Sequence, residues 1–310
     1  MRIITITLNP VFDIHLEVDS FVVSDQSYAA KRTAYAGGKG INISRALYNC
    51  GYKSCAYIVM GNDNAQAFED LLEGGLDCTK ILYTHGEIRQ NIIIQSKNHG
   101  ETRIGYDSFC VDDTCLQRLY ELISRDIETE KCIVVLAGKN PKGISDDAIC
   151  EFLLKIKQSG ALLVIDSNSF GVQQLCAVSP WLIKPNESEI QALCGQSIQT
   201  HDKAMLCAKE LCKKGIQNVF VTLGQNGSVF ASKEFCAFIS TPKIVPLSTV
   251  GAGDSVIAGF CAAFSEGREI TECLKYAVAF GSAACLTNGS LPPDLKDVNS
   301  LVEKVKVQKE

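Results

Sequence analysis

The 310-residue sequence has no continuous apolar run of the length, about 18 residues, that a membrane-spanning helix requires. Its N-terminus, MRIITITLNP, alternates like a strand and lacks the apolar core and cleavage site of a secretory leader. An excess of basic residues is also missing, because 30 Lys and Arg stand against 35 Asp and Glu, which argues against general nucleic-acid binding. We therefore expect a soluble cytoplasmic protein that binds neither a membrane nor a nucleic acid.

Metal-binding or redox cysteine pairs are absent too, although the chain contains 15 cysteines. No CxxC pair occurs, and neighbours such as Cys50 and Cys55 lie five residues apart, which is neither a zinc nor a redox spacing. Most cysteines lie in apolar segments such as KCIVVL and FCAAF, where a free thiol packs as a small hydrophobic side chain. The cysteines therefore indicate a reducing compartment.

Strand-like and helix-like segments alternate over most of the chain. Apolar strand patterns occur at residues 3–8, 56–60, 132–138, 161–166, 181–186 and 218–224. Helical patterns occur at residues 41–49, 145–158, 187–194, 201–214, 254–265 and 270–286. Continuous β-branched runs that alternate with helices are typical of a parallel sheet covered on both faces.

Two segments, 15–33 and 87–105, interrupt this alternation with strand patterns that have no helix between them. They predict a small antiparallel sheet that projects from the main one. The sequence shows no internal repeat and no linker rich in proline and serine. We therefore predict a single domain, residues 1–310, with a small appendage.

The segment STVGAGDSV, residues 248–256, lacks the lysine of a Walker A loop and the third glycine of a GxGxxG turn. Gly251 and Gly253 would let backbone N–H groups approach an anion at the start of a helix. Asp254 would then lie beside a phosphate, where a base that deprotonates a hydroxyl group belongs. An aspartate that caps a buried helix explains the same residues equally well.

Three further motifs each have a local structural explanation. GGKGIN, residues 37–42, suits a backbone that passes close to a polar ligand, but also a tight strand-to-helix turn. KPNESE places Asn186 and Glu189 on one face of a helix, where they could hold a hydrated Mg²⁺ or form a capping box. TLGQNGS, residues 222–228, is typical of a hairpin.

Six motifs in order, TLNPVFD, GGKGIN, RQN, KPNESE, TLGQNG and TVGAGDS, resemble those of the phosphofructokinase-B (ribokinase-like) carbohydrate kinases. The resemblance runs from Thr7 to about Gly289 and is strongest to the branch of 1-phosphofructokinases and tagatose-6-phosphate kinases. It implies a ribokinase-like three-layer α/β/α sandwich with a mostly parallel central sheet. It also implies a small β-sheet lid, formed by about residues 13–33 and 87–107, that closes over the sugar and often joins a homodimer.

By this resemblance, the activity is ATP-dependent phosphorylation of a ketohexose phosphate, of the fructose 1-phosphate or tagatose 6-phosphate type, to a bisphosphate. Asp254 would be the catalytic base, and Gly251, Ala252 and Gly253 the anion hole. Cofactor binding by ATP and Mg²⁺ is implied for Asn186, Glu189 (to the metal through water), Thr222, Gly224 and Gly227. Substrate binding is implied for Asp13, Gly37, Gly38, Lys39, Asn42 and Arg89.

The chain departs from this family at AGKNP, residues 137–141, where the phospho-sugar branch usually has SGSLP. Lys139 replaces a serine expected to help hold the substrate phosphate, and no basic residue stands at Gln26 or Tyr28. We expect Lys139, with Lys31 and Arg32, to supply the missing charge. The alternatives are a kinase of an unphosphorylated sugar or nucleoside, and a non-catalytic protein that senses sugar phosphates or nucleotides.

Overall fold

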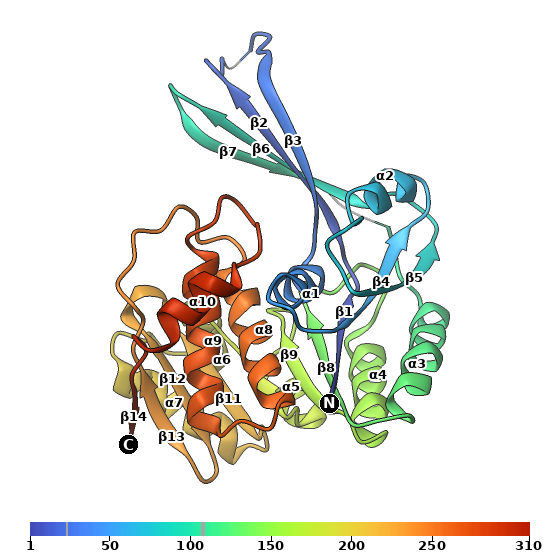
Figure 1. Cartoon of the computed structure of the whole chain (residues 1–310). Helices are drawn as coiled ribbons and strands as arrows, with labels where there is room; N and C mark the ends of the chain where they lie inside the picture. Colours follow the sequence, from blue (N-terminus) through green and yellow to red (C-terminus); the bar gives the residue numbers. More distant parts are fainter. Residues whose placement is uncertain (23, 107–108) are drawn as a thin grey trace.

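The structure, a computed structural model, describes residues 1–22, 24–106 and 109–310 and contains two β-sheets (Figure 1). Residues 23 and 107, which the predicted lid includes, lie outside the described residues. Helices cover both faces of the larger sheet, and the smaller sheet projects away from it. None of the described helices is long and apolar enough to cross a bilayer.

The larger sheet has ten strands in the order β14-β13-β12-β11-β10-β9-β8-β1-β4-β5. Neighbours from β5 to β11 pair in parallel, whereas β12, β13 and β14 add antiparallel pairs at one edge. The strands are β1 (Arg2–Thr7), β4 (Cys55–Gly61), β5 (Cys78–Thr84), β8 (Cys132–Ala137), β9 (Leu162–Asp166), β10 (Leu182–Ile183), β11 (Asn218–Thr222), β12 (Ser228–Ser232), β13 (Cys236–Ile239) and β14 (Val307–Lys309). Because parallel strands end at one edge, residues that follow them are gathered there.

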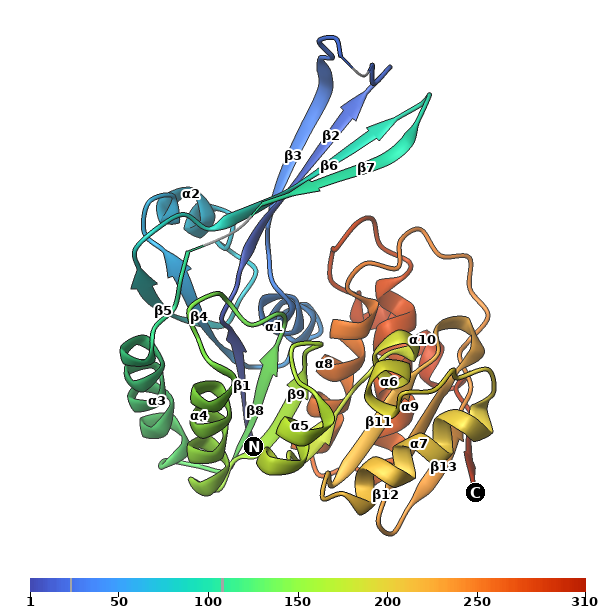
Figure 2. The same cartoon turned by 180° about the vertical axis from the view of Figure 1, so that it is seen from behind.

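Helices divide between the two faces of this sheet (Figures 1 and 2). One face carries α1 (Lys39–Asn49), α8 (Ala252–Ser265), α9 (Ile270–Ala284) and α10 (Leu295–Val302). The other carries α3 (Asp113–Ile127), α4 (Asp146–Gln158), α5 (Val172–Val178), α6 (Glu187–Cys194) and α7 (His201–Lys213). The three-layer α/β/α sandwich with a mostly parallel sheet is therefore confirmed.

Local sequence explains where several of these elements begin. The hydroxyl group of Ser145 accepts a hydrogen bond from Ala148 N and starts α4, and Thr200 caps α7 in the same way. Strands β4 and β8 are buried along their whole length, as their apolar runs predict. A Cβ atom on Gly259 of α8 would lie 2.8 Å from Phe280 of α9, so this glycine permits the close approach of the two helices.

The smaller sheet has the order β3-β2-β6-β7, with β2 (Val11–Val18), β3 (Ala29–Gly37), β6 (Arg89–Ser96) and β7 (Gly100–Gly105). Its two outer pairs are antiparallel as predicted, but the central pair, β2 and β6, is parallel. The reason is that β2 and β6 both leave the main sheet in the same direction and each turns back through its own hairpin (Figure 1). Helix α2 (Ala65–Asp70) supports the base, where the rings of Phe68 and Phe12 meet edge to face at 5.1 Å.

All fifteen cysteines are free thiols. Seven are buried, and burial raises the pKa of Cys50 to about 12 and that of Cys115 to about 11. Cys50 and Cys115 therefore pack as apolar side chains and stay protonated at neutral pH.

Candidate active site

The GAGD turn forms the start of α8. Gly251 occupies the cap position with φ of +77°, so Asp254 lies in the first turn of the helix. The alternative in which Asp254 caps this helix is therefore wrong, because the cap position is already taken by Gly251. The N–H group of Ala252 donates a long hydrogen bond to the carbonyl oxygen of Thr249 at 3.4 Å, whereas those of Gly251 and Gly253 have no backbone acceptor in the described part of the chain and are available to an anion.

The carboxyl group of Asp254 is buried and accepts a hydrogen bond from Asn42 Nδ2 at 2.8 Å. Burial, followed by the nearby charge of Asp166, raises the pKa of Asp254 to about 6, against the opposing effects of Lys39, Asn42 and Lys184. A carboxyl group that titrates near neutral pH is suited to accept a proton from a hydroxyl group. The family resemblance implied that Asn42 binds the sugar. In the structure its side-chain amide contacts the carboxyl group of Asp254, the candidate base.

Beside this turn, Lys39 and Lys184 share the buried carboxylate of Asp166. Lys39 was predicted from the sequence as a site residue, whereas Lys184 and Asp166 were not. Lys39 Nζ lies 3.2 Å from Asp166 Oδ2, and Lys184 Nζ lies 3.5 Å from Asp166 Oδ1. Burial would lower the pKa of Lys39, but Asp166, Asp254 and Glu189 together raise it. Asp166 ends an apolar strand and Lys184 begins the KPN motif, and these positions are the signals that could have found them.

Lys184 is 4% exposed, and its Nζ lies only 3.3 Å from the place where a side chain on Gly253 would begin. The glycine therefore leaves room for an ammonium group directly against the N-terminal turn of α8. Two ammonium groups, those of Lys39 and Lys184, thus face the single carboxylate of Asp166, so one negative charge is shared by two positive ones. This arrangement favours an anion at the turn.

GGKGIN forms the turn between β3 and α1. Gly38 caps the helix with φ of +144°, and a Cβ atom on Gly37 would collide with Oδ2 of Asp13. Both glycines are therefore required by geometry. The helix that follows points Lys39 and Asn42 toward Asp166 and Asp254.

A second group of predicted residues meets at the base of the smaller sheet. Asn91 Nδ2 donates to Asp13 Oδ1 at 2.9 Å, and Arg89 Nε donates to Asn9 Oδ1 at 3.1 Å. Burial lowers the pKa of Arg89 and raises that of Asp13. Asn9 Nδ2 reaches the carbonyl oxygen of Asn140 at 3.5 Å, which places the neighbouring Lys139 next to this group in the chain. In the described residues, no side-chain hydrogen bond joins this group to Asp254.

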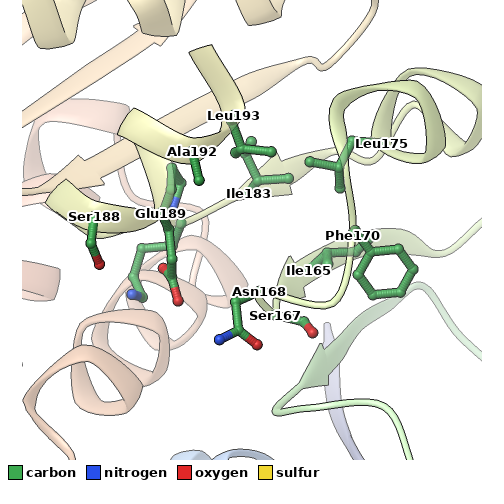
Figure 3. Close-up of a pocket in the computed structure, with 12 residues that line it drawn as sticks. Ile165, Ser167, Asn168, Phe170, Leu175, Ile183, Ser188, Glu189, Ala192 and Leu193 are labelled. Carbon is green, nitrogen blue, oxygen red and sulfur yellow. The ribbon is translucent and has the colours of Figure 1, made fainter. Parts of the chain in front are cut away.

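The KPNESE motif begins α6 with both halves of a capping box. Asn186 Oδ1 accepts from Glu189 N, and Glu189 Oε2 accepts from Asn186 N, each at 2.9 Å. The carboxyl group of Glu189 also points, with Asn168, into a cavity of about 230 Å³, which is lined as well by apolar residues that include Leu193 and Leu175 (Figure 3). The capping box is therefore present, and it uses only one carboxylate oxygen of Glu189, so the second oxygen is available to a ligand.

TLGQNGS forms the predicted hairpin, in which a short 3₁₀ turn, η1 (Gly224–Asn226), joins β11 to β12. Gly224 and Gly227 have φ of +58° and +96°. Thr222 ends β11 and pairs with Asn186, which ties this turn to the start of α6. The described structure records no contact of Gly224 or Gly227 with the residues around Asp254.

The oxygen donors near Glu189 suit a Mg²⁺ ion that keeps most of its water ligands, and not one that is coordinated by protein groups alone. No group of three His, Cys, Asp or Glu side chains that could hold a metal exists in the described residues. The available donors are oxygens, from Glu189, Asn168 and Ser188. Mg²⁺ keeps several waters and is commonly held through one or two carboxylates and substrate phosphates, so these residues fit it.

Comparison with known proteins gives one consistent result. Residues 6–296 match the family model described as pfkB family carbohydrate kinase. The chain is 31% identical to a 1-phosphofructokinase of Borreliella burgdorferi, over 99% of this chain and 98% of that protein. It is 30% identical to a 1-phosphofructokinase of Bacillus subtilis, over 92% and 93% of the two chains. The crystal structure of Escherichia coli phosphofructokinase-2 in complex with fructose-6-phosphate superposes with a TM-score of 0.87, at 23% identity and 98% coverage of both chains.

Proposed function

The chain belongs to the pfkB family of carbohydrate kinases, and from that premise we propose that it phosphorylates a hydroxyl group of a ketohexose phosphate. ATP donates the phosphoryl group and the product is a bisphosphate. The observation that carries the choice of substrate is Arg89, a half-buried guanidinium group held only by neutral amide oxygens in the described part of the chain. A guanidinium in this state can bind a phosphate group of the substrate.

Asp254 accepts the proton of the substrate hydroxyl group as the hydroxyl oxygen attacks the γ-phosphorus of ATP. Its pKa of about 6 leaves the carboxylate mostly ionised at neutral pH, and still basic enough to take a proton in the transition state. Asn42 orients the carboxylate through its hydrogen bond to Oδ2. This leaves Oδ1 to face the substrate.

The backbone N–H groups of Gly251, Ala252 and Gly253 stabilise the charge that develops on the transferred phosphoryl group. Lys184, directly beside Gly253, adds a positive charge that burial keeps from being screened by water. Phosphoryl transfer depends mainly on position and on charge stabilisation. A turn of backbone amides, one ammonium group and one carboxylate supply both.

The nucleotide lies on the side of Thr222, Gly224 and Gly227, whose turn is joined to the start of α6. Glu189, held in place by its capping box with Asn186, would hold Mg²⁺ through water at this side. The metal neutralises part of the phosphate charge when bound. The chain's own contribution is to fix the Glu189 carboxylate by the capping box, so that it faces the cavity.

The sugar phosphate lies between the smaller sheet and α1. Asp13, Gly37, Gly38, Lys39 and Asn42 contact its hydroxyl groups, and Arg89 with Lys139 binds its phosphate. The position of Lys139, adjacent to the Asn140 carbonyl that Asn9 contacts, supports a role beside Arg89. The smaller sheet then serves as a lid.

A panel of sugar phosphates, unphosphorylated sugars and nucleosides, each with ATP and coupled detection of ADP, tests this proposal. We expect turnover with fructose 1-phosphate or tagatose 6-phosphate. Replacing Arg89 with alanine should raise the KM for that substrate by about 10- to 100-fold, since a charge-assisted contact is lost. Turnover of an unphosphorylated sugar with unchanged KM in the Arg89→Ala variant would refute the assigned substrate class.

The exposed edges of the lid suggest a contact between two copies of the chain. Its edge strands are β3 and β7, the first half of β3 is exposed, and Tyr28 and Ile104 are 77% and 48% exposed. Unpaired edges of this kind associate with other strands, so we propose a homodimer through the lid. Sedimentation analysis of the wild-type protein and of a Tyr28→Glu/Ile104→Glu variant tests it, because a lid dimer should become a monomer in the variant.

A further inference from the structure

Asn91 lies between two groups of opposite charge at the base of the lid. Strands β2 and β6 are parallel, and their register makes Asp13 the direct partner of Asn91 and Val11 that of Arg89. Residues two apart on a strand share a face, so Asp13, Asn91 and Arg89 all lie on one face of the lid. Asn91 donates to Asp13 Oδ1 at 2.9 Å and accepts from Arg89 Nη1 at 3.4 Å.

The chemistry of the two partners fixes the orientation of the Asn91 amide. An ionised carboxylate can only accept, and a guanidinium group can only donate. The NH₂ group of Asn91 must therefore face Asp13 and its oxygen must face Arg89. Gly105, the β7 partner of Asn91, leaves space for this oxygen, since a Cβ atom there would lie 3.3 Å from it.

Asp13 and Arg89 are thus held close together without forming an ion pair. In the part of the chain that the structure describes, neither appears in an ion pair with any residue, although the charge of Arg89 acts on the pKa of Asp13. When an arginine and a carboxylate group meet directly, they frequently form a bidentate pair. Such a pair would occupy both of the groups that the sugar phosphate needs.

We infer that Asn91 is a positioning residue that determines specificity for a phosphorylated sugar. Its amide keeps Asp13 and Arg89 apart, so that the carboxylate stays free for a substrate hydroxyl group and the guanidinium stays free for the substrate phosphate. Asn9 assists as a second neutral partner, by accepting from Nε of Arg89 at 3.1 Å. The remaining N–H groups of Arg89 are then directed to the ligand. This inference rests on the proposed function.

The test is a double-mutant cycle between Asn91→Asp and Arg89→Ala, read as kcat/KM for fructose 1-phosphate or tagatose 6-phosphate, whichever the wild-type protein phosphorylates. The new carboxylate would pair with Arg89 and repel Asp13. In the wild-type background we expect kcat/KM to fall about 10- to 100-fold, the usual range for a charged hydrogen bond, through KM, with the KM for ATP unchanged. In the Arg89→Ala background the same change should cost clearly less than in the wild type, because the loss through Arg89 has already occurred and only the repulsion of Asp13 remains.

Asn98→Asp is the matched control, because it makes the same chemical change on the far turn of the lid, where Asn98 contacts Phe21 and Ser20. It should leave kcat/KM within about twofold of the wild type. If Asn91→Asp does not fold, as judged by circular dichroism, Asn91→Ala replaces it in the same cycle. The Asn91→Ala substitution should allow Arg89 to pair with Asp13, so kcat/KM should again fall.

Two results are distinguishable. Absence of turnover of both fructose 1-phosphate and tagatose 6-phosphate by the wild-type protein would remove the proposed function and this inference with it. Turnover by the wild type, with equal losses from the Asn91 substitution in both backgrounds, would keep the function and overturn the inference. Equal losses would mean that Asn91 supports the lid without acting on Arg89.

Discussion

Replacing Asp254 with asparagine should inactivate the protein and at the same time stabilise it. Burial raises the pKa of Asp254 from 3.8 to about 6, a change of roughly 2 units, and each unit corresponds to about 1.4 kcal/mol. As the pH rises, the carboxyl group loses its proton in the unfolded chain before it does so in the folded one. Ionisation of Asp254 therefore has no effect on stability below about pH 4 and lowers it progressively between about pH 4 and pH 6. Above about pH 6 the full destabilisation is present. At pH 8 the neutral amide of the Asp254→Asn variant should therefore raise the free energy of unfolding by up to about 3 kcal/mol.

Urea unfolding of the wild type and of Asp254→Asn between pH 4 and pH 8 measures this difference. It should be largest at pH 8 and shrink to near zero at pH 4, while kcat falls by about 10²- to 10⁴-fold at neutral pH. Asp166→Asn is the matched control, because it leaves Lys39 and Lys184 without their shared carboxylate and should destabilise the protein. Two results would refute the assignment of Asp254 as a buried catalytic base with a raised pKa. They are an Asp254→Asn variant that is less stable than the wild type at pH 8, and one with near-normal turnover.

Two further substitutions test the site. Removing the Asn42 hydrogen bond with Asn42→Ala should move the acidic limb of kcat, near pH 6 in the wild type, to higher pH, since that bond lowers the pKa of Asp254. The substrate phosphate titrates in the same range, so the shift between variants is the measurement, and no shift or a downward one would contradict the role of Asn42. Gly227→Ala should destabilise the protein by at least about 1–3 kcal/mol and raise the KM for ATP, because its φ is +96° and a Cβ atom would lie 2.6 Å from the carbonyl oxygen of Ile239. Gly224→Ala, with φ of +58° and open space around it, is the control for stability and should cost only about 1 kcal/mol, so an equal loss of stability in both variants would count against this explanation.

The elements that followed directly from sequence were those with strong, continuous apolar patterns. Strand β8 lies at Cys132–Ala137 within the predicted 132–138, and α4 (Asp146–Gln158) lies within the predicted 145–158, with Ser145 as its cap. The predicted strand at 181–186 shortens to Leu182–Ile183, because the proline at 185 and the Asn186 cap end it. Helix α3 was not predicted, although Asp112 caps it and its apolar residues follow helical spacing, a signal that was present in the sequence.

Of the candidate site, the residues inside recognisable motifs could be predicted, and the residues that act on them could not. Asp166 ends β9 and Lys184 directly follows β10, two strands that α5 separates in the chain, and only the parallel pairing of β9 with β10 brings the two side chains together. Asn9 precedes β2 and meets Arg89 of β6 only after β2 and β6 pair, and the same pairing brings Asp13 to Asn91. Contacts of this kind depend on register, which no local pattern specifies.

The sequence by itself determined the alternation of strands and helices, the glycine turns at 37–38 and 251–253, and, through the order of six motifs, the kinase family. These follow from local physics, since apolar periodicity, caps and positive φ angles are properties of a few adjacent residues. The tertiary structure decided which groups face Asp254, and how far burial and the charge of Asp166 raise its pKa. Electrostatic effects depend on distance and on exclusion of water, and both are set only when the carboxyl ends of the strands meet the helices that pack on them.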